Sequence, residues 1–342
     1  MTATLADLPF IYLYLRLDAA EPPLFRSKER GKDRPNQLVP EEFHPTVEQF
    51  GKAIAAGTHG HEGYIDFEGV RCRLTQQKMF DGAIWVCARR LNTALPQLNK
   101  LGFAPHIYNH LHGLGTREGL ILISGNTVQG KTTTAAGLLV DFLQTYGGTA
   151  FAVEDTIEYV LKGRHGDAGQ CFQVEAKTDE EWQASLRRGL RWAPRYIFVG
   201  EVSSPKVAEQ LLHAATTGHT VITTLNAGAP EEALTGYLFL AEQAMGSGAA
   251  GLLAAGLTAL LHQNMREEGP FIRYLFTEEN APGDPIRSVI REGKISSLAN
   301  YIDRIAARLA NQPGNVLPPL TVPTNLPPLP GRGSLPPLPK KS

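Results

Sequence analysis

The stretch ISGNTVQGKTTTAAG, from Ile123 to Gly137, decides the fold of this chain. Gly125, Gly130, Lys131 and Thr132 satisfy the pattern G-x-x-x-x-G-K-[ST], which in a phosphate-binding loop follows a strand and opens a helix. The apolar run LILIS precedes the pattern, and TTTAAGLLVDFLQTYGG follows it and stops at two glycines. The stretch therefore predicts a P-loop between a buried strand and a helix.

The residue types of this loop suit phosphate chemistry. Glycine lets the backbone curl so that successive N–H groups point at phosphate oxygens, and the helix N-terminus adds its positive dipole end. We expect Lys131 to place its charge at the β- and γ-phosphates of a nucleoside triphosphate, and the Thr132 hydroxyl to ligate Mg²⁺. A glycine turn with a solvated lysine is the structural alternative. The predicted nucleotide-binding residues are Gly125, Asn126, Thr127, Val128, Gln129, Gly130, Lys131, Thr132 and Thr133.

Two acidic clusters follow apolar runs further along the chain. YIFVGE ends at Glu201, and FAVEDTIEYV carries Glu154, Asp155 and Glu158. In a parallel α/β sheet ligands bind outside the carboxyl ends of the strands, so we expect both clusters at the γ-phosphate. Glu201 is the candidate for holding Mg²⁺ through water, because Gly200 stands where P-loop enzymes usually have an aspartate. A solvated acidic turn is the alternative for the second cluster.

The region from about residue 109 alternates short β-rich runs with segments of helical length. LILIS, AFAV, YIFVG and TVITTL are apolar on both faces, which implies a parallel sheet covered by helices on both sides. We therefore predict an α/β fold with a RecA-like P-loop NTPase core over residues 109–312. In GHTVITTLNAG, His219 begins a strand, where it either senses the γ-phosphate or acts as a cap.

The two ends of the chain differ from this core. Residues 1–108 predict an N-terminal α+β (PAS-like) domain, in which YIDFEGVRCRL and AIWVCARRL pair as a hairpin connected by QQKMFDG. A helix is predicted over Ser297–Gln312. Residues 313–342 hold ten prolines and three LPPL repeats, and predict a disordered tail that is either a semi-rigid tether or a ligand for an aromatic-lined groove.

The bulk composition is that of a soluble globular protein, with 42% hydrophobic residues and a formal net charge of -1. Without a global basic field we expect no direct nucleic-acid binding. Cys72, Cys87 and Cys171 have no CxxC spacing, which indicates reduced thiols and no metal site. The uncharged stretch Gly246–Leu261 is shorter than the roughly 20 residues of a membrane helix and predicts a buried helix.

Four motifs occur in one order along the chain: G-N-T-V-Q-G-K-T-T, V-E-D-T-I-E-Y, L-R-x-G-L-R-W-A-P-R-Y-I-F-V-G-E and T-G-H-T-V-I-T-T-L-N-A. This series, within Tyr64 to about Leu298, resembles the secretion-superfamily ATPases, the hexameric motors of type IV pili and of type II and type IV secretion. The resemblance implies a cytoplasmic homo-hexamer that hydrolyses ATP. It also implies attachment to the inner membrane through a platform protein of the machine.

The resemblance also implies roles for single residues. Glu158 closes the acidic box and works with Glu201 in activating the attacking water. T-G-H-T looks like the histidine box, with His219 as its first histidine. G-V-R-C-R-L looks like the strand whose arginines, here Arg71 and Arg73, reach the γ-phosphate, and a solvated strand face is the alternative.

One further stretch distinguishes subgroups. PIRSVIREGKISSL, from Pro285 to Leu298, is similar to A-I-R-x-L-I-R-E-G-K of the pilus-retraction, or twitching-motility, ATPases, although an ordinary amphipathic helix has the same pattern. The chain also departs from its family: Val202, Ser203 and Ser204 replace M-R-D, and Asn226 replaces the second histidine of T-L-H. A conjugative or type IVB secretion ATPase, and an ATP-binding regulator with little hydrolysis, are the other hypotheses.

Overall fold

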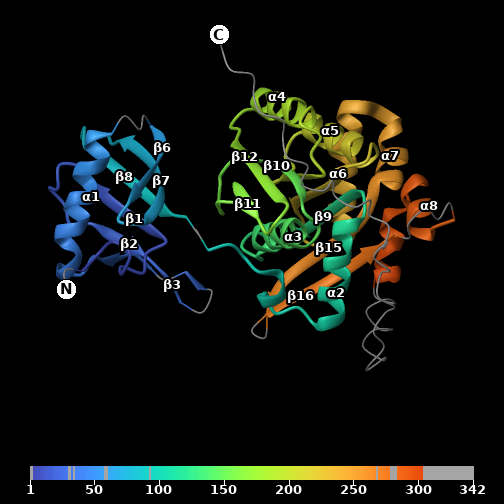
Figure 1. Cartoon of the computed structure of the whole chain (residues 1–342). Coiled ribbons are helices and arrows are strands. Elements are labelled where there is room, and N and C mark those ends of the chain that lie inside the picture. The colour runs from blue at the N-terminus through green and yellow to red at the C-terminus, as the bar shows by residue number, and fades with distance from the viewer. Residues whose placement is uncertain are drawn as a thin grey trace, which may run out of the picture.

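The computed structural model describes residues 3–29, 32–33, 35–57, 61–91, 94–266, 269–277 and 283–302. The Pro-rich tail and most of the helix predicted over Ser297–Gln312 lie outside these residues. The described strands form a six-stranded sheet, an eight-stranded sheet and a small two-stranded ribbon. Figure 1 shows the six-stranded sheet with its helix in blue and the eight-stranded sheet with its helices in green to orange.

The six-stranded sheet is antiparallel throughout, in the order β5-β2-β1-β8-β7-β6. In the strand that comes first along the chain, alternate side chains are buried. Its Leu13 and Leu15 share a core with Phe50 and Ile54 of α1. A helix therefore covers one face, and the other face is left for polar residues. The elements are β1 Tyr12–Arg16, β2 Leu24–Arg26, β5 Gln37–Leu38, α1 His44–Ala56, β6 Glu62–Phe67, β7 Val70–Lys78 and β8 Ile84–Arg90, and the ribbon is β3 Lys28–Glu29 with β4 Lys32–Asp33.

The hairpin predicted in this region is wrong in its details. Residues 64–74 are not one strand, because the chain reverses at Glu68 and Gly69, which both have positive φ, 48° and 76°. Two consecutive residues with positive φ make the tight turn that joins antiparallel strands. The sequence QQK belongs to β7, so β6, β7 and β8 form a meander of three strands.

The eight-stranded sheet has the order β11-β12-β10-β13-β14-β9-β15-β16. Its six central strands are parallel, as predicted, and the two edge strands β11 and β16 are antiparallel to their neighbours. The sheet is therefore mixed. Its strands are β9 Gly119–Gly125, β10 Gly148–Glu154, β11 Gly163–His165, β12 Gly169–Glu175, β13 Tyr196–Val199, β14 Thr220–Asn226, β15 Leu257–Arg266 and β16 Gly269–Phe276.

Helices cover both faces of this sheet (Figure 1). α2 and α3 pack on one face and bury a core that includes Leu111 and Phe142, whereas α4 to α8 pack on the other. The domain boundary predicted at residue 108 falls within α2 and stays a prediction. The helices are α2 Pro105–Gly113, α3 Lys131–Tyr146, α4 Asp179–Leu190, α5 Pro205–Ala215, α6 Pro230–Met245, α7 Ala249–Gly256 and α8 Pro285–Arg291.

The helical stretch Pro230–Gly256 is long and apolar enough to cross a membrane, by length and composition only. Gly246, with φ 67°, divides it into α6 and α7, and Tyr237 and Leu253 are buried beneath the sheet. The buried helix predicted over residues 246–261 ends at Gly256. From Leu257 the chain pairs with β9 as a central parallel strand, so its apolar residues serve a sheet and not a helix.

Candidate nucleotide-binding site

The loop at the carboxyl end of β9 has a backbone conformation that requires glycine at two positions. Gly125 and Gly130 have φ of 149° and 77°, and a side chain at Gly125 would lie 2.3 Å from the carbonyl oxygen of Gln263. Val128 also adopts a positive φ, 66°, which strains a β-branched residue. A curled, glycine-dependent loop that leads directly into α3 is the geometry of a phosphate cradle.

The neighbouring strand β15 braces this loop. The Gln263 side chain donates to the carbonyl oxygen of Gln129 (2.7 Å) and accepts from the Thr134 hydroxyl (2.7 Å). The backbone N–H of Met265 donates to the Gln129 side chain (2.5 Å). Sequence reasoning missed Gln263, because no motif marks it and more than a hundred residues separate it from the loop. These hydrogen bonds hold the loop in shape.

Lys131, the first residue of α3, is buried, with 7% of its surface exposed. Its Nζ donates to the carbonyl oxygen of Asn126 (2.8 Å) and to Oδ1 of Asn226 (2.6 Å). Burial lowers the pKa of Lys131, and the nearby charges of Glu201 and Glu158 act in the opposite direction. The amine is therefore held at the loop by two oxygens, with both predicted acids within electrostatic reach.

Asn226 joins this lysine to Glu201. It is the last residue of β14 and lies opposite Gly125 in the parallel register. Its Nδ2 donates to Oε1 of Glu201 (2.5 Å), which follows the neighbouring strand β13. Burial raises the pKa of Glu201, although the charge of Lys131 and the Asn226 hydrogen bond lower it. Hydrogen bonds thus join Lys131, Asn226 and Glu201 into one polar chain. This chain runs across the carboxyl ends of three neighbouring strands, β9, β14 and β13.

The acidic segment begins inside the core. Glu154 is the last residue of β10 and is 2% exposed, and it accepts a hydrogen bond from the Gln173 side chain (2.6 Å). Burial raises the pKa of Glu154 to about 8, so this acid is largely protonated at neutral pH. Gly200 lies against Glu154, since a Cβ at position 200 would lie 3.1 Å from the Glu154 Cγ. Contact with Glu154 therefore accounts for a glycine where an aspartate is usual.

Two arginines of the N-terminal sheet reach this segment. Arg73 of β7 and Arg89 of β8 lie directly opposite each other. Arg89 donates to Oε1 of Glu158 (2.9 Å), and Arg73 donates to the Thr156 hydroxyl. Like charges directly opposite each other in a sheet repel, so such a pair indicates an anion nearby. This signal could have identified Arg89, which sequence reasoning missed because it paired the two strands without assigning their register.

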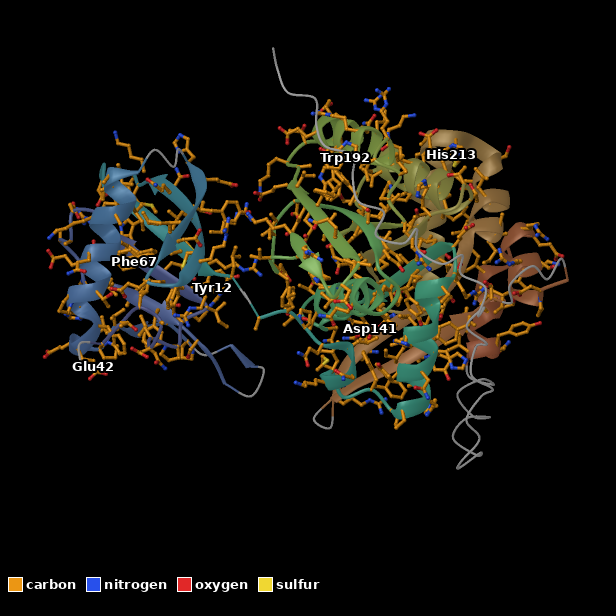
Figure 2. All side chains as sticks on the ribbon, in the orientation of Figure 1. Tyr12, Glu42, Phe67, Asp141, Trp192 and His213 are labelled. Carbon is orange, nitrogen blue, oxygen red and sulfur yellow. The ribbon has the colours of Figure 1, made fainter. Side chains whose placement is uncertain are left out.

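Arg71, the other predicted arginine, contacts its own sheet. It pairs with Asp66 (3.3 Å) and lies over the Tyr64 ring, with 5.7 Å from the guanidinium carbon to the ring centroid. The structure therefore brings Arg73 to the acidic segment and shows Arg71 in local contacts. Tyr12, labelled in Figure 2, lies opposite Arg89 in the same cross-strand row, on the face of the sheet away from the buried Leu13.

His219 lies at the edge of the sheet opposite the P-loop, and its predicted catalytic role stays a prediction. It precedes β14, whose first residue pairs with Gly119 and whose last pairs with Gly125. A seven-residue strand spans about 20 Å. Because the strands are parallel, the residue before a strand lies at the edge opposite the P-loop. The His219 ring hydrogen-bonds instead to the carbonyl oxygen of Pro194 (2.7 Å).

Two other stretches that sequence reasoning singled out have structural contacts. Ser204 is buried and occupies the cap position before α5. Arg287 of the PIRSVIREGK stretch donates to the carbonyl oxygen of Ala254 (2.5 Å) and to the Thr277 hydroxyl (3.1 Å), which ties α8 to the end of α7 and to the sheet.

The residues present fit a magnesium nucleotide. The glycine-dependent loop, the helix N-terminus and the buried amine of Lys131 form an anion site. Among the residues that the structure describes, no group of three or more His, Cys, Asp and Glu side chains could hold a metal. Mg²⁺ suits such a site, since it is bound through one or two protein ligands together with substrate phosphates.

The comparisons with known proteins agree with this geometry. Residues 77–284 of the 342 match the family described as type II/IV secretion system protein. The chain belongs to this family. The resemblance to secretion and pilus ATPases that the ordered motifs predicted is thereby confirmed.

Individual relatives of the family cover parts of the chain. A putative type II secretion system protein E of Escherichia coli is 32% identical over 182 residues, 52% of this chain and 36% of that protein. The type IV pilus ATPase PilU of Pseudomonas aeruginosa is 32% identical over 43% of this chain and 37% of its own length. The chain thus spans about a third of these relatives. The crystal structure of the pilus retraction motor PilT with bound ADP matches with a TM-score of 0.69 at 25% identity and covers 87% of each chain.

We predict that Glu154→Gln stabilises the protein at alkaline pH. Between about pH 4.5 and 8 the unfolded chain loses a proton that native Glu154 keeps, so the free energy of unfolding falls as the pH rises. The amide still accepts from Gln173 and has no proton to lose. At about pH 8 the free energy of unfolding of Glu154→Gln should exceed that of the wild type by at least about 1 kcal/mol, which corresponds to a Tm roughly 2–4 °C higher in thermal unfolding. At about pH 5 this difference between variant and wild type should be smaller. An equal gain at both pH values would contradict the buried, protonated state of Glu154.

Proposed function

We propose that this chain is an ATPase that hydrolyses ATP to power a type IV pilus or type IV secretion machine, and that it is most similar to the pilus-retraction ATPases. The observation that carries this proposal is the polar chain from Lys131 through Asn226 to Glu201 at the mouth of a glycine-dependent loop. Two relatives, a type IV pilus ATPase and a pilus retraction motor with bound ADP, support it.

The proposed roles follow from position. Lys131 and the N–H groups of the loop hold the β- and γ-phosphates of the substrate. The Thr132 hydroxyl and, through water, Glu201 would hold Mg²⁺, which supplies positive charge to the phosphates when it is bound. Glu201 and Glu158 orient the attacking water. Burial raises the pKa of Glu201, which strengthens it as a proton acceptor relative to a solvated carboxylate.

Arg73 and Arg89 supply the positive charge for the transition state. They contact Thr156 and Glu158 of the acidic segment and so lie beside the proposed catalytic carboxylate. A triphosphate is a stronger anion than a single carboxylate and competes for the same guanidinium groups. If a triphosphate replaced these contacts, the N-terminal sheet would move relative to the P-loop sheet in a hinge-type change. The different contacts that ATP and ADP make with the arginines would drive this change.

The proposed assembly and location come from the family resemblance. We propose a homo-hexamer in the cytoplasm, held at the inner membrane by a platform protein of the pilus or secretion machine. The LPPL repeats of residues 313–342 would contact a separate partner. An ATP-binding regulator is the second candidate, because Asn226 and Ser204 replace residues usual in the family and Asn226 sits between the lysine and the acid.

Lys131→Ala should abolish ATP binding. The substitution removes the only side-chain cation in contact with the loop backbone among the described residues, and with it the charge that faces the phosphates. Fluorescent-nucleotide titration of the full chain should show at least about a 10²-fold weaker Kd. Lys206→Ala is the matched control, since Lys206 forms a surface pair with Glu209, and it should bind normally. Unaltered binding in Lys131→Ala would refute the site.

Glu201→Gln should bind ATP normally and lose turnover by at least about 10²-fold, the low end for a positioned acid or base. The amide keeps a hydrogen-bonding contact with Asn226 and loses the negative charge. Phosphate release with Mg²⁺ measures the loss, and Glu48→Gln, on the exposed side of α1, is the control. Full turnover in Glu201→Gln would exclude its proposed role. A wild-type chain that binds ATP and releases no phosphate would favour the regulator.

Arg89→Gln should lower turnover by at least about 10²-fold, less than the 10³ to 10⁵ ascribed to a sole arginine, because Arg73 remains. ATP affinity should change far less than turnover, since the charge matters most in the transition state. Arg16→Gln is the control, because Arg16 pairs with Asp18 and Glu21 away from the acidic segment. A change in affinity without a change in turnover would argue against a role in the transition state.

A further inference from the structure

The segment that carries Glu158 has no regular structure of its own. Residues 155–162 connect β10 to β11 as bends and coil, with a single bridge residue at Tyr159. Backbone polar groups in such a segment need partners supplied from elsewhere. The position of the Glu158 carboxylate therefore depends on the contacts that hold this segment. Lys177 contacts the carbonyl oxygen of Asp155, and the arginines contact Thr156 and Glu158 as described above. The other contacts involve Gln173 and Tyr159.

Gln173 on β12 makes four side-chain contacts here, three with this segment and one with Glu154 at the end of β10. Its Nε2 donates to Oε1 of Glu154 (2.6 Å) and to the carbonyl oxygen of Tyr159 (2.9 Å). Its Oε1 accepts from the backbone N–H groups of Leu161 (2.9 Å) and Lys162 (3.2 Å). A primary amide has two donors and two acceptor lone pairs, so every one is used. β12 pairs in parallel with β10, which places Gln173 beside the start of the segment.

Tyr159 supplies the connection to the P-loop. It directly follows Glu158, and its hydroxyl hydrogen-bonds to the Thr133 hydroxyl (2.8 Å) in the first turn of α3. Thr133 is adjacent to Thr132, the proposed Mg²⁺ ligand. Tyr159 is thus held at both ends, by Gln173 through its backbone carbonyl and by α3 through its side chain. Leu161, which is 1% exposed, anchors the following residues in the core.

We infer that Gln173 and Tyr159 are positioning residues that fix Glu158 relative to the P-loop helix. Gln173 lies in none of the four ordered motifs, and Tyr159 is the last residue of V-E-D-T-I-E-Y, to which no role has been assigned above. This inference rests on the proposed ATPase function. The contacts join β10, β12, the acidic segment and α3 into one unit, which we call the Gln173–Tyr159 clamp. The clamp holds the backbone next to Glu158, while Arg89 of the N-terminal sheet contacts the Glu158 carboxylate.

The test uses the full chain and three variants. Gln173→Ala removes all four side-chain contacts, and Tyr159→Phe removes only the hydroxyl contact with Thr133. Gln170→Ala is the matched control, because Gln170 lies on the same strand and its side chain donates only to the neighbouring carbonyl of Cys171 (3.2 Å) in the contacts described. Phosphate release gives kcat and KM, fluorescent-nucleotide titration gives Kd, and amide hydrogen exchange reports on residues 161 and 162.

We expect kcat to fall at least about 10-fold in Gln173→Ala and Tyr159→Phe, with KM and Kd within about two-fold, because a misplaced catalytic group costs turnover more than binding. Exchange at the Lys162 amide should accelerate at least about 10-fold in Gln173→Ala, since its acceptor is lost. Gln170→Ala should match the wild type. A loss of kcat and Kd together would show a general structural role and overturn the inference.

Two other outcomes separate a failure of this inference from a failure of the proposed function. If kcat stays within about two-fold of the wild type in both variants, the clamp does not position Glu158, and the inference fails while the ATPase proposal stands. If the wild-type chain releases no phosphate, the proposed function fails. The catalytic part of the inference then falls with it, whereas unchanged exchange at Lys162 in Gln173→Ala would overturn the clamp itself.

Discussion

A buried amine at the P-loop is the constraint on which the site depends. The charge of Lys131 is costly to bury unless oxygens surround it, and its partners come from the loop itself and from Asn226 on the neighbouring strand. These groups meet only if β14 lies beside β9 and runs parallel to it with Asn226 opposite Gly125. Glu201 joins them because β13 is the next strand along. The order of three parallel strands thus assembles the site.

The same edge of the sheet also connects the two halves of the chain. Tyr64 of the N-terminal sheet donates to Glu175 (2.7 Å), and Arg73 and Arg89 contact the acidic segment beside it. These contacts are polar, and within the described part of the chain none of the three hydrophobic clusters joins the two sheets. They can therefore exchange for other anions without unfolding either sheet. A nucleotide that competes for the arginines would therefore act on the position of a whole sheet through a few side chains.

Sequence reasoning succeeded where the signal is local. The P-loop, its flanking strand and helix, and the glycine stop at Gly147 depend on consecutive residues, and the structure has them as expected. It failed where the signal needs a partner strand. Arg89 and Gln173 were missed, because their significance lies in cross-strand neighbours.

The sequence by itself determined that the chain has a P-loop in an α/β sheet, that acids follow two of the strands, and that the motifs match the secretion and pilus family. Glycine conformations, apolar runs and motif order are properties of the chain read along its length. Only the tertiary structure decided that Asn226 links Lys131 to Glu201, that Arg89 pairs with Glu158, and that His219 lies elsewhere. Strand order and register bring together residues far apart in the chain, and no local pattern encodes that pairing.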